Sequence, residues 1–326
     1  MTLILTRSDV LALLDHRDVI DAVARAHAEL TVGTADQPAP VPLRLPPATH
    51  AYLPMAAASR ELRAVGVKLL ADMPDNRALG RPAQRSTLLV GDPETGACEA
   101  VIDGWALTQC RTAAASAVAS RHLARPDSRV LGLVGAGALA DAHVAALRAV
   151  LPLERVLVWS RSAATIEAFV ARNRELPVTV AQTAEEAVRG CDVLCTLTPA
   201  REPLVRGAWF TEGLHVNAVG APPRHDYREI DTEGIVRARV VVDSLTVALH
   251  DSGDILIPLA EHAIDQAHVA VELGDVVSGR LPGREKDSQI TLFDSVGLAL
   301  QDLAAARLII DRARAAGIGR VVDLTH

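Results

Sequence analysis

A glycine-rich turn at Gly135-Ala136-Gly137 has the residue types that a pyrophosphate site needs. It follows an apolar run expected to form a strand, and it precedes a stretch with helical periodicity. In such a turn Gly135 permits the sharp bend, Gly137 lets a pyrophosphate approach the backbone, and Ala140 lets helix and strand pack closely. Free N–H groups at the start of the helix then face the phosphates, and Gly135, Ala136, Gly137 and Ala138 are the expected cofactor contacts. The motif predicts a dinucleotide site, with a purely structural Gly-X-Gly turn as the alternative.

The residues Ser160, Arg161 and Ser162 bear on which dinucleotide is bound. They end the second expected strand, beginning 25 residues after Gly135. An acid at this place binds the ribose hydroxyls of NAD, whereas a nearby Arg accommodates the 2′-phosphate of NADP. Here no carboxylate repels that phosphate, Arg161 can pair with it, and the hydroxyls can donate to it. The sequence therefore predicts that NADP(H) is preferred, with NAD(H) as the alternative cofactor and a solvated turn as the structural interpretation of Arg161.

The elements that position these residues follow from hydrophobic patterning. From residue 129 onward, short apolar runs alternate with helix-like stretches, a pattern typical of a doubly wound parallel sheet. Strands are expected at 129–134, 155–159, 178–181, 192–197, 214–219 and 239–243. The predicted fold class of this part is therefore α/β.

The remainder of the chain lacks this regular alternation of strands and helices. Helices are expected within 1–37, over 103–124 and over 297–315. Ser8 or Asp9 is expected to cap the first of them. Residues 38–102 are strand-like and rich in proline, which indicates an antiparallel or mixed sheet, and a last strand is expected over 320–324.

Length and composition limit the class of protein. The chain has 326 residues, enough for about two domains, with 49% hydrophobic and 22% charged residues. A formal net charge of −7 argues against a nucleic-acid partner. The N-terminus lacks a signal-peptide pattern, and no apolar stretch reaches the roughly 18 residues of a membrane span. A soluble cytoplasmic protein is expected, with neither membrane nor nucleic acid as a partner.

The four cysteines do not indicate a metal site. Cys191 and Cys195 are four residues apart, but no histidine lies at ligand spacing beside them. No metal is expected, and the cysteines are interpreted as small buried hydrophobic residues.

Three cations in the first half of the chain have apolar or alanine-rich neighbours. Arg44 lies in VPLRLPP, Lys68 in AVGVKLLAD and Arg111 in QCRTAAASA. Taken one at a time, each is best interpreted as a solvent-exposed side chain, because Lys and Arg are rarely buried. What unites them is a resemblance between this sequence and a known family.

Several motifs, in order along the chain, resemble those of the ornithine cyclodeaminase and mu-crystallin family. They are GVKLLADMPDNRALGRP, DPETGACEAVIDGWALTQCRTAAASAVAS, VGAGALA, VWSRS, HVNAVGA, REID, ARVVVDS and ITLFDSVGLALQDLAAA. The resemblance covers the chain from about residue 40 to the end. It implies a homodimer in which a Rossmann-type dinucleotide-binding domain, 126–301, is inserted in a smaller α+β substrate-binding and dimerisation domain, 1–125 plus 302–326.

The resemblance also implies roles for individual residues. Arg44, Lys68 and Arg111 match the positions that hold the substrate carboxylate, and Lys68 with Arg111 would serve catalysis. Besides the glycine-rich turn and the Ser-Arg-Ser segment, the positions that match cofactor contacts are Thr112, Thr196, Thr198, Val219 and Ser295. Charge-assisted partners suit an α-carboxylate, and a lysine in an apolar site would have a lowered pKa and could exchange a proton near neutral pH.

One segment departs from the family pattern. Ornithine cyclodeaminases carry an acid just after the strand that reads NAVGA here, and the matching residue is Pro222. Pro222 cannot act as a base, so Asp226, further along the loop, is the candidate catalytic replacement, with His225 as a second one. His215 is interpreted as structural, and Asp294 stands where relatives often have a cation.

The resulting expectation is an NADP(H)-preferring oxidoreductase that reduces a small cyclic or linear imino acid to an amino acid. Arg44 and Arg111 would clamp the carboxylate, while Lys68 would polarise or protonate the imine. A cyclodeaminase that releases ammonia from ornithine or a similar diamino acid is the first alternative. The second comes from another class, a crystallin-like protein that binds NADPH without catalysis.

Overall fold

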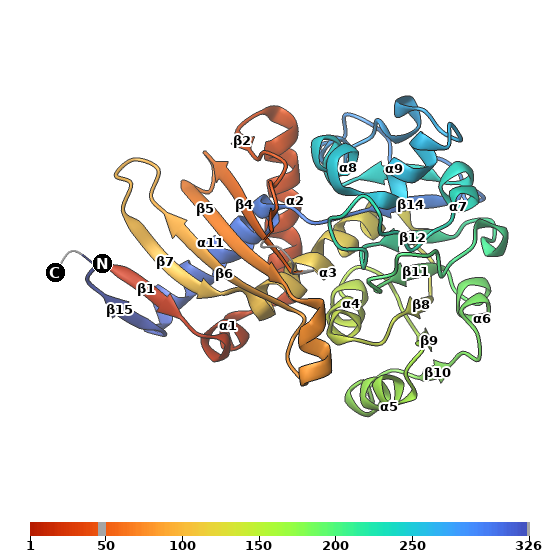
Figure 1. The fold of residues 1–326 in the computed structure, drawn as a ribbon, viewed down its shortest axis with the longest axis horizontal. Coiled ribbons are helices and arrows are strands. Elements are labelled where there is room, and N and C mark those ends of the chain that lie inside the picture. The colour runs from red at the N-terminus through yellow and green to blue at the C-terminus, as the bar shows by residue number, and fades with distance from the viewer. Residues whose placement is uncertain (45–49, 325–326) are drawn as a thin grey trace. The chain divides into compact units, whose positions relative to one another are not determined.

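The computed structural model describes residues 1–44 and 50–324, and the chain divides into two compact units (Figure 1). They are Met1–Arg111 with Leu298–His326, here called unit 1, and Thr112–Gly297, here called unit 2. The division falls inside helix α3 (Gly104–Leu123). The domain limits expected from the sequence, at 125/126 and 301/302, stay a prediction.

Unit 1 is built around an eight-stranded sheet. Its strands are β1 (Thr2–Leu5), β2 (Ala35–Asp36), β3 (Leu43–Arg44), β4 (Ala51–Ser59), β5 (Ala64–Asp72), β6 (Gln84–Gly91), β7 (Cys98–Asp103) and β15 (Arg320–Val322). They lie in the order β15-β1-β7-β6-β5-β4-β2, with β3 paired to β4. All pairs are antiparallel except β1 with β7. Residues 38–102 are expected from the sequence to form an antiparallel or mixed sheet. Their strands pair antiparallel with one another, and the sheet as a whole is mixed because β1 pairs parallel with β7.

The helices of unit 1 are α1 (Arg7–Leu13), α2 (His16–Val32), the short 3-10 helix η1 (Pro74–Leu79) and α11 (Ala299–Ala316). Helix α11 packs on α2 and on strands β4 and β5, as Figure 1 shows. The N-terminus differs from the prediction in two ways. Residues Thr2–Leu5 form a strand because they pair with β7 and β15. Thr6, rather than Ser8 or Asp9, caps α1, and Asp9 closes a capping box by accepting from Thr6 N at 2.9 Å.

Strand β5 buries its only cation and exposes apolar residues. Its even-numbered residues are buried, and among them Lys68 is fully inaccessible to solvent. Helix α11 covers this side, since a Cβ added at Gly66 would lie 2.8 Å from Leu303 Cδ1. The other side of β5 carries three apolar side chains that are 39–46% exposed, Val65, Val67 and Leu69. The interpretation of Lys68 as a solvated residue is therefore wrong.

Unit 2 is a seven-stranded parallel sheet in the order β10-β9-β8-β11-β12-β14-β13. Its strands are β8 (Val130–Val134), β9 (Arg155–Trp159), β10 (Val178–Val180), β11 (Val193–Thr196), β12 (His215–Ala218), β13 (Arg239–Val242) and β14 (Thr291–Asp294). The chain winds from β8 to β10 and then in the opposite direction from β11, so β8 and β11 flank the switch point where such sheets bind ligands. The predicted doubly wound, Rossmann-type sheet is confirmed.

Strand β14 lies outside the predicted set of strands. Its four buried residues follow a polar segment rather than a helix, so the alternation of strands and helices gives no sign of it. It enters the sheet between β12 and β13 and runs parallel to both. The carboxyl ends of these three strands therefore lie side by side.

The helices of unit 2 are α4 (Ala138–Arg148), α5 (Ala163–Arg172), α6 (Ala184–Arg189), η2 (Gly207–Trp209), α7 (Thr232–Arg237), α8 (Leu245–Asp251), α9 (Gly253–Ala260), η3 (Gln266–Val269) and α10 (Leu273–Val277). The core of the unit takes apolar residues from most of its strands, including Val134, Leu194, Val216, Val240 and Leu292. Across residues 1–44 and 50–324, no helix has the combined length and apolar character that crossing a bilayer would take.

Candidate functional site

A buried charge cluster in unit 1 joins two of the predicted site residues. Lys68 Nζ lies 2.5 Å from Asp302 Oδ2, and Arg111 Nε lies 2.9 Å from Asp302 Oδ1. Lys68 and Asp302 are completely buried, and Arg111 is 5% exposed. Strand β5, helix α3 and the first turn of α11 supply the three residues. Each carboxylate oxygen of Asp302 thus binds one cation.

A glutamine and a histidine extend this arrangement. Arg111 Nη1 donates to Gln301 Oε1 at 2.8 Å, and Leu298 N donates to the same oxygen at 3.3 Å. At the other end of the amide, Gln301 Nε2 lies 3.1 Å from His27 Nε2. Two consecutive residues of α11 therefore hold the guanidinium of Arg111. We refer to Lys68, Arg111, Gln301 and Asp302 as the cation cluster.

The pKa of Lys68 is lowered from an ordinary value of 10.5 to about 8, and burial is the largest cause. The neighbouring charge of Arg111 also lowers this pKa, whereas Asp302 raises it through its charge and its hydrogen bond. With Lys68 protonated, the cluster holds two cations against one carboxylate, so its net charge is +1. One further anion would balance that charge, and a lysine with this pKa can transfer a proton near neutral pH.

The other residues expected to handle the substrate are placed elsewhere. The backbone of Arg44 pairs with Ala51 in the β3–β4 ladder, and its side chain lies outside the described residues. Asp226 belongs to unit 2, where it and His225 are exposed in a turn. Pro222, which is expected from the resemblance to match the acid of cyclodeaminases, is buried. The catalytic role of Asp226 stays a prediction.

The glycine-rich turn of unit 2 is a tight strand-to-helix connection. Gly135 has φ +114°, and its N–H donates to Trp159 O at 2.8 Å. A Cβ at Gly135 would lie 2.9 Å from Leu197 O, so a larger residue would force a shift. Gly137 caps α4, and no atom lies within 4 Å of the place where its Cβ would be. The exposed backbone of Gly137 and Ala138 therefore opens onto free space at a helix N-terminus, which favours an anion.

The segment Ser160–Ser162 combines two hydroxyls with one exposed cation. Ser162 caps α5, its Oγ accepting from Thr165 N at 3.3 Å. Ser160 Oγ lies 3.3 Å from Thr165 Oγ1, and Arg161 is exposed. A phosphate at the end of β9 would therefore meet hydroxyls and a positive charge within this segment, and no carboxylate of the segment itself.

Glu229 links the carboxyl ends of β11 and β12. Its Oε1 accepts from Thr198 N at 2.6 Å and from Thr198 Oγ1 at 2.7 Å. Its Oε2 accepts from Thr196 Oγ1 at 2.8 Å and from Gly220 N at 2.7 Å. The hydroxyl protons of Thr196 and Thr198 are thereby engaged, so these hydroxyls are left to act as acceptors. We call Glu229 with Thr196, Thr198 and Gly220 the Glu229 hub.

Asp254 in turn holds the backbone of this hub. Its carboxylate accepts from Glu229 N at 3.1 Å and from Ile230 N at 2.9 Å. Burial raises the pKa of Glu229, and burial together with the charge of Glu229 raises the pKa of Asp254 to about 7. Burial also raises the pKa of Asp294, with the charges of Asp254 and Asp243 adding to the effect. These groups of unit 2 are thus buried carboxyls bound mainly to neutral donors.

Asp243 connects the ends of β13 and β14. Its Oδ2 accepts from Ser295 Oγ at 2.7 Å and from Gly297 N at 2.9 Å. Ser295 N donates to Ala218 O at 3.0 Å, so the serine is fixed at both its backbone and its side chain. The Ser295 hydroxyl proton is engaged by Asp243, and its oxygen is left to accept from an amide group.

Several residues expected near the cofactor are buried. They are Thr112, Ala136, Thr196, Val219 and Ser295. Thr112 is the first residue of unit 2, and Val219 follows the end of β12, where its N–H donates to Thr196 O at 3.3 Å. His215 is structural, as interpreted from the sequence: it is completely buried, its Nδ1 lies 3.0 Å from Thr291 Oγ1, and burial lowers its pKa to about 3.

Sequence patterning does not assign roles to the residues that organise these sites. Asp302 and Gln301 lie in ITLFDSVGLALQDLAAA, and Glu229 lies in REID, so the motifs mark their segments only. The bond between Lys68 and Asp302 joins residues 234 positions apart. No local pattern encodes such a contact.

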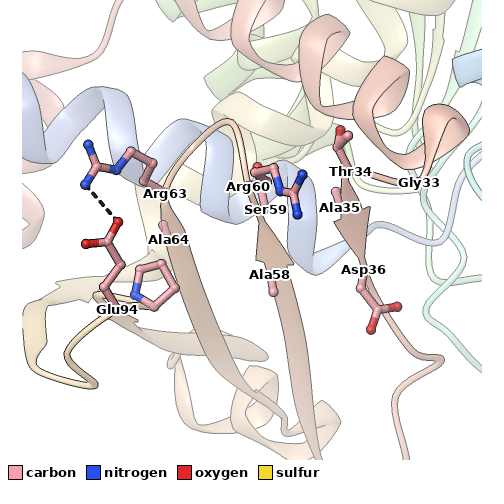
Figure 2. Close-up of a pocket in the computed structure, with 11 residues that line it drawn as sticks. Gly33, Thr34, Ala35, Asp36, Ala58, Ser59, Arg60, Arg63, Ala64 and Glu94 are labelled. Carbon is pink, nitrogen blue, oxygen red and sulfur yellow. Dashed lines mark hydrogen bonds and ion pairs between the residues drawn. The ribbon is translucent and has the colours of Figure 1, made fainter.

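An open pocket in unit 1 is separate from the cation cluster. Its volume is about 690 Å³. Figure 2 shows its lining residues on strands β2, β4 and β5 and the segments beside them. Its lining includes Arg60, Arg63 and Glu94, and Arg63 Nη2 lies 3.1 Å from Glu94 Oε1. No cluster residue lines this pocket. Within the described part of the chain, no group of His, Cys, Asp and Glu is arranged to hold a metal ion.

Comparison with known proteins gives matches over nearly the whole chain. A model of the ornithine cyclodeaminase/mu-crystallin family matches residues 1–317. Ketimine reductase mu-crystallin of Rattus norvegicus is 40% identical over 230 residues, which are 71% of this chain and 70% of that protein.

Two solved structures share both the fold and the length of the chain. Δ1-pyrroline-2-carboxylate reductase of Thermococcus litoralis, in complex with NADH and L-proline, is 36% identical with a TM-score of 0.95, covering 98% of this chain and 100% of that one. An archaeal alanine dehydrogenase dimer with bound NAD is 34% identical with a TM-score of 0.93, covering 99% of each chain.

Proposed function

Because the chain belongs to the ornithine cyclodeaminase/mu-crystallin family, we propose that it is a nicotinamide-dependent oxidoreductase that reduces the C=N bond of a small imino acid. The observation that carries the proposal is the cation cluster of unit 1. It has a net charge of +1, which matches a single carboxylate, and a lysine that titrates near neutral pH. A protein that only bound a dinucleotide would need neither feature.

The roles of the cluster residues follow from their charges. Arg111 binds the substrate carboxylate through charge-assisted hydrogen bonds, and Arg44 is expected to assist it. Lys68, protonated at neutral pH, gives a proton to the imine nitrogen. The dinucleotide, when bound, supplies the hydride that the α-carbon receives. One hydride and one proton thus convert the imino acid to the amino acid.

We propose that unit 2 binds the dinucleotide and prefers NADP(H). The open backbone at Gly137 suits the pyrophosphate, and Ser160, Arg161 and Ser162 suit a 2′-phosphate. Ser295, whose proton is engaged by Asp243, would accept from the carboxamide of the nicotinamide. The two solved relatives hold NADH and NAD, so the proposed preference for NADP(H) is supported by residues 160–162 of this chain alone.

We further propose that the protein is a homodimer that uses the outer face of the unit 1 sheet. Val65, Val67 and Leu69 on β5 and Leu89 on β6 are 39–47% exposed in the single chain. An apolar sheet face of this kind is typical of an interface. The archaeal alanine dehydrogenase relative is a dimer.

Reduction is favoured over cyclodeamination by the loop after β12. Pro222 replaces the acid that cyclodeaminases carry, and Asp226 is exposed in a turn. If cyclodeamination is excluded, Asp226 has no required role in the chemistry.

The test is a panel of cyclic and linear imino acids supplied with NADPH or NADH. The proposal predicts that nicotinamide absorbance falls as an equal amount of amino acid forms. Diamino acids are tested in parallel with NAD⁺ or NADP⁺. Release of ammonia from a diamino acid without net nicotinamide change would establish the cyclodeaminase instead, and tight NADPH binding with neither reaction would establish a binding protein.

A further inference from the structure

The chain uses lysine at only two positions. Of its 33 Lys and Arg residues, Lys68 and Lys286 are the lysines, and every other cation is an arginine. Lys286 is exposed, whereas Lys68 is the largest of the completely buried side chains. Arginine does not lose its proton in proteins, so an arginine at position 68 could supply charge but no proton. This choice of residue points to proton transfer at Lys68.

Asp302 is placed to control that proton. Lys68 stands between Met55 of β4 and Leu88 of β6, which offer no charge. Among the described residues, the charged groups that act on it are Arg111 from α3 and Asp302 from α11, with Gln301 and His27 lying beyond Arg111. Burial and Arg111 both favour the neutral amine, and Asp302 alone favours the ammonium ion.

The same carboxylate orients Arg111. Its Nε donates to Asp302 and its Nη1 donates to Gln301, so both ends of the guanidinium plane are fixed. The hydrogen bonds to Asp302 and Gln301 use Nε and Nη1 and leave Nη2 out. The substrate carboxylate would therefore bind Nη2 of a guanidinium whose orientation is already fixed, rather than a guanidinium that is free to rotate.

We propose that Asp302 is the positioning residue of the substrate site: it keeps Lys68 protonated for transfer to the imine and presents Nη2 of Arg111 to the substrate carboxylate. This inference rests on the proposed reduction for its purpose. The ion pairs on which it depends join residues of unit 1 alone.

The test is a direct titration of Lys68 in the full-length protein. Lysine labelled with 13C and 15N at its side-chain end gives two NMR signals, since the chain has two lysines, and the exposed Lys286 serves as the reference. In the wild-type protein the Lys68 signal is expected to titrate near pH 8. In Asp302→Asn its midpoint should fall by roughly 1–3 pH units, because the one favourable charge is gone.

A matched control lies on the same helix. Asp311 pairs with Arg307 at 2.7 Å but is 62% exposed, so Asp311→Asn removes a carboxylate of α11 without touching the cluster. The Lys68 midpoint should not move in this variant. An unchanged midpoint in Asp302→Asn would overturn the proposal. No turnover is measured, so the result stands whether or not the reductase assignment survives.

Kinetics supply the functional arm of the test. In Asp302→Asn the alkaline decline of kcat/KM for imine reduction should move to lower pH by the same amount as the NMR midpoint, and Asp302→Glu should restore part of the shift. A rate that drops equally at every pH, with no displaced decline, would contradict the positioning role.

If Asp302→Asn does not fold, a double variant tests whether Asp302 is the counter-ion of Lys68. Lys68→Met leaves Asp302 paired with Arg111, so this single variant should fold. Lys68→Met/Asp302→Asn should then fold as well, because its net charge returns to +1 and the amide oxygen of Asn can still accept from Arg111 Nε. Failure of the double variant beside a folded Lys68→Met protein would mean that the fold needs the Asp302 carboxylate for Arg111 and not for Lys68, and the proposal would be abandoned.

Discussion

The cation cluster of unit 1 and the Glu229 hub of unit 2 use buried carboxylates in opposite ways. Asp302 binds two side-chain cations, and it raises the pKa of Lys68 against the lowering by burial and by Arg111. Glu229 binds hydroxyls and backbone N–H groups, and the pKa that moves is its own. A buried carboxylate with charged partners shifts the pKa of a neighbouring cation. A buried carboxyl group that binds only neutral donors has its own pKa raised by burial.

This difference suits the cation cluster to proton transfer and the Glu229 hub to dinucleotide binding. A lysine with a pKa of about 8 can transfer a proton, so the cation cluster has what a reaction needs. The hub instead fixes the ends of two neighbouring strands, so it has what a bound dinucleotide needs. Variants in the cluster should therefore lower turnover, and variants in the hub should lower dinucleotide affinity.

The largest effect is expected from Lys68→Met. It removes the proton donor while filling the same buried space, so kcat should fall about 10²–10⁴-fold, the usual contribution of general acid catalysis. Dinucleotide affinity, measured by fluorescence titration of NADPH, should change by less than about threefold, well under 1 kcal/mol. Equal losses in turnover and affinity would break the separation between the two regions.

Glu229→Gln should produce the reverse pattern. An amide keeps one acceptor oxygen but presents an NH₂ group to donors, so two of the four hydrogen bonds are lost. The Kd for NADPH should rise roughly 10- to 100-fold, since a hydrogen bond to a charged group contributes about 1.5–3 kcal/mol. Glu233→Gln, on the exposed side of α7, is the control and should leave the Kd unchanged. A hub variant that binds NADPH normally but turns over slowly would reverse the assignment.

Ser160→Asp tests the cofactor preference of unit 2. The new carboxylate would repel a 2′-phosphate, so the ratio of kcat/KM for NADPH to that for NADH should fall at least roughly tenfold, because like charges in contact cost more than about 1.4 kcal/mol. Ser160→Asn has nearly the same shape without the charge and should keep the wild-type ratio. If both variants behave alike, the Ser-Arg-Ser segment does not select the cofactor.

A smaller effect is expected from pH alone. Lys68 is protonated below its pKa of about 8 and loses its proton above it, so kcat/KM for reduction should halve near pH 8 and fall further as pH rises. Oxidation of the amino acid needs the neutral amine, so its rate should rise over the same range. Residual activity of Lys68→Arg should lack the decline near pH 8, since a guanidinium keeps its proton. If Lys68→Arg showed the same decline of kcat/KM near pH 8, the titrating group would belong to the substrate and not to Lys68.

The two units differ in how far their sequence predicts them. In unit 2 the apolar runs and the Gly-X-Gly turn predict the parallel sheet and the place of Gly135 and Gly137, because both depend on local residue types. Strand β14 is the exception, since the long polar segment 278–290 separates it from the preceding helix α10.

Unit 1 shows where local patterning fails. On β5 the face with Val65, Val67 and Leu69 is the more apolar one, yet the opposite face is buried. Alternation predicts that a strand has two faces but not which face a distant helix will cover. The contact between Lys68 and Asp302 depends on α11, 234 residues later, so the motif could mark Lys68 but not its partner.

The central claim, that the cation cluster binds the carboxylate of the substrate, is tested most directly by titrating Lys68 with the product amino acid present. With the protein saturated by oxidised dinucleotide and product, the bound carboxylate should balance the net charge of +1, and the Lys68 NMR midpoint should move above 8 while Lys286 stays unchanged. A product that binds, by calorimetry, and leaves the Lys68 midpoint where it was would contradict the account.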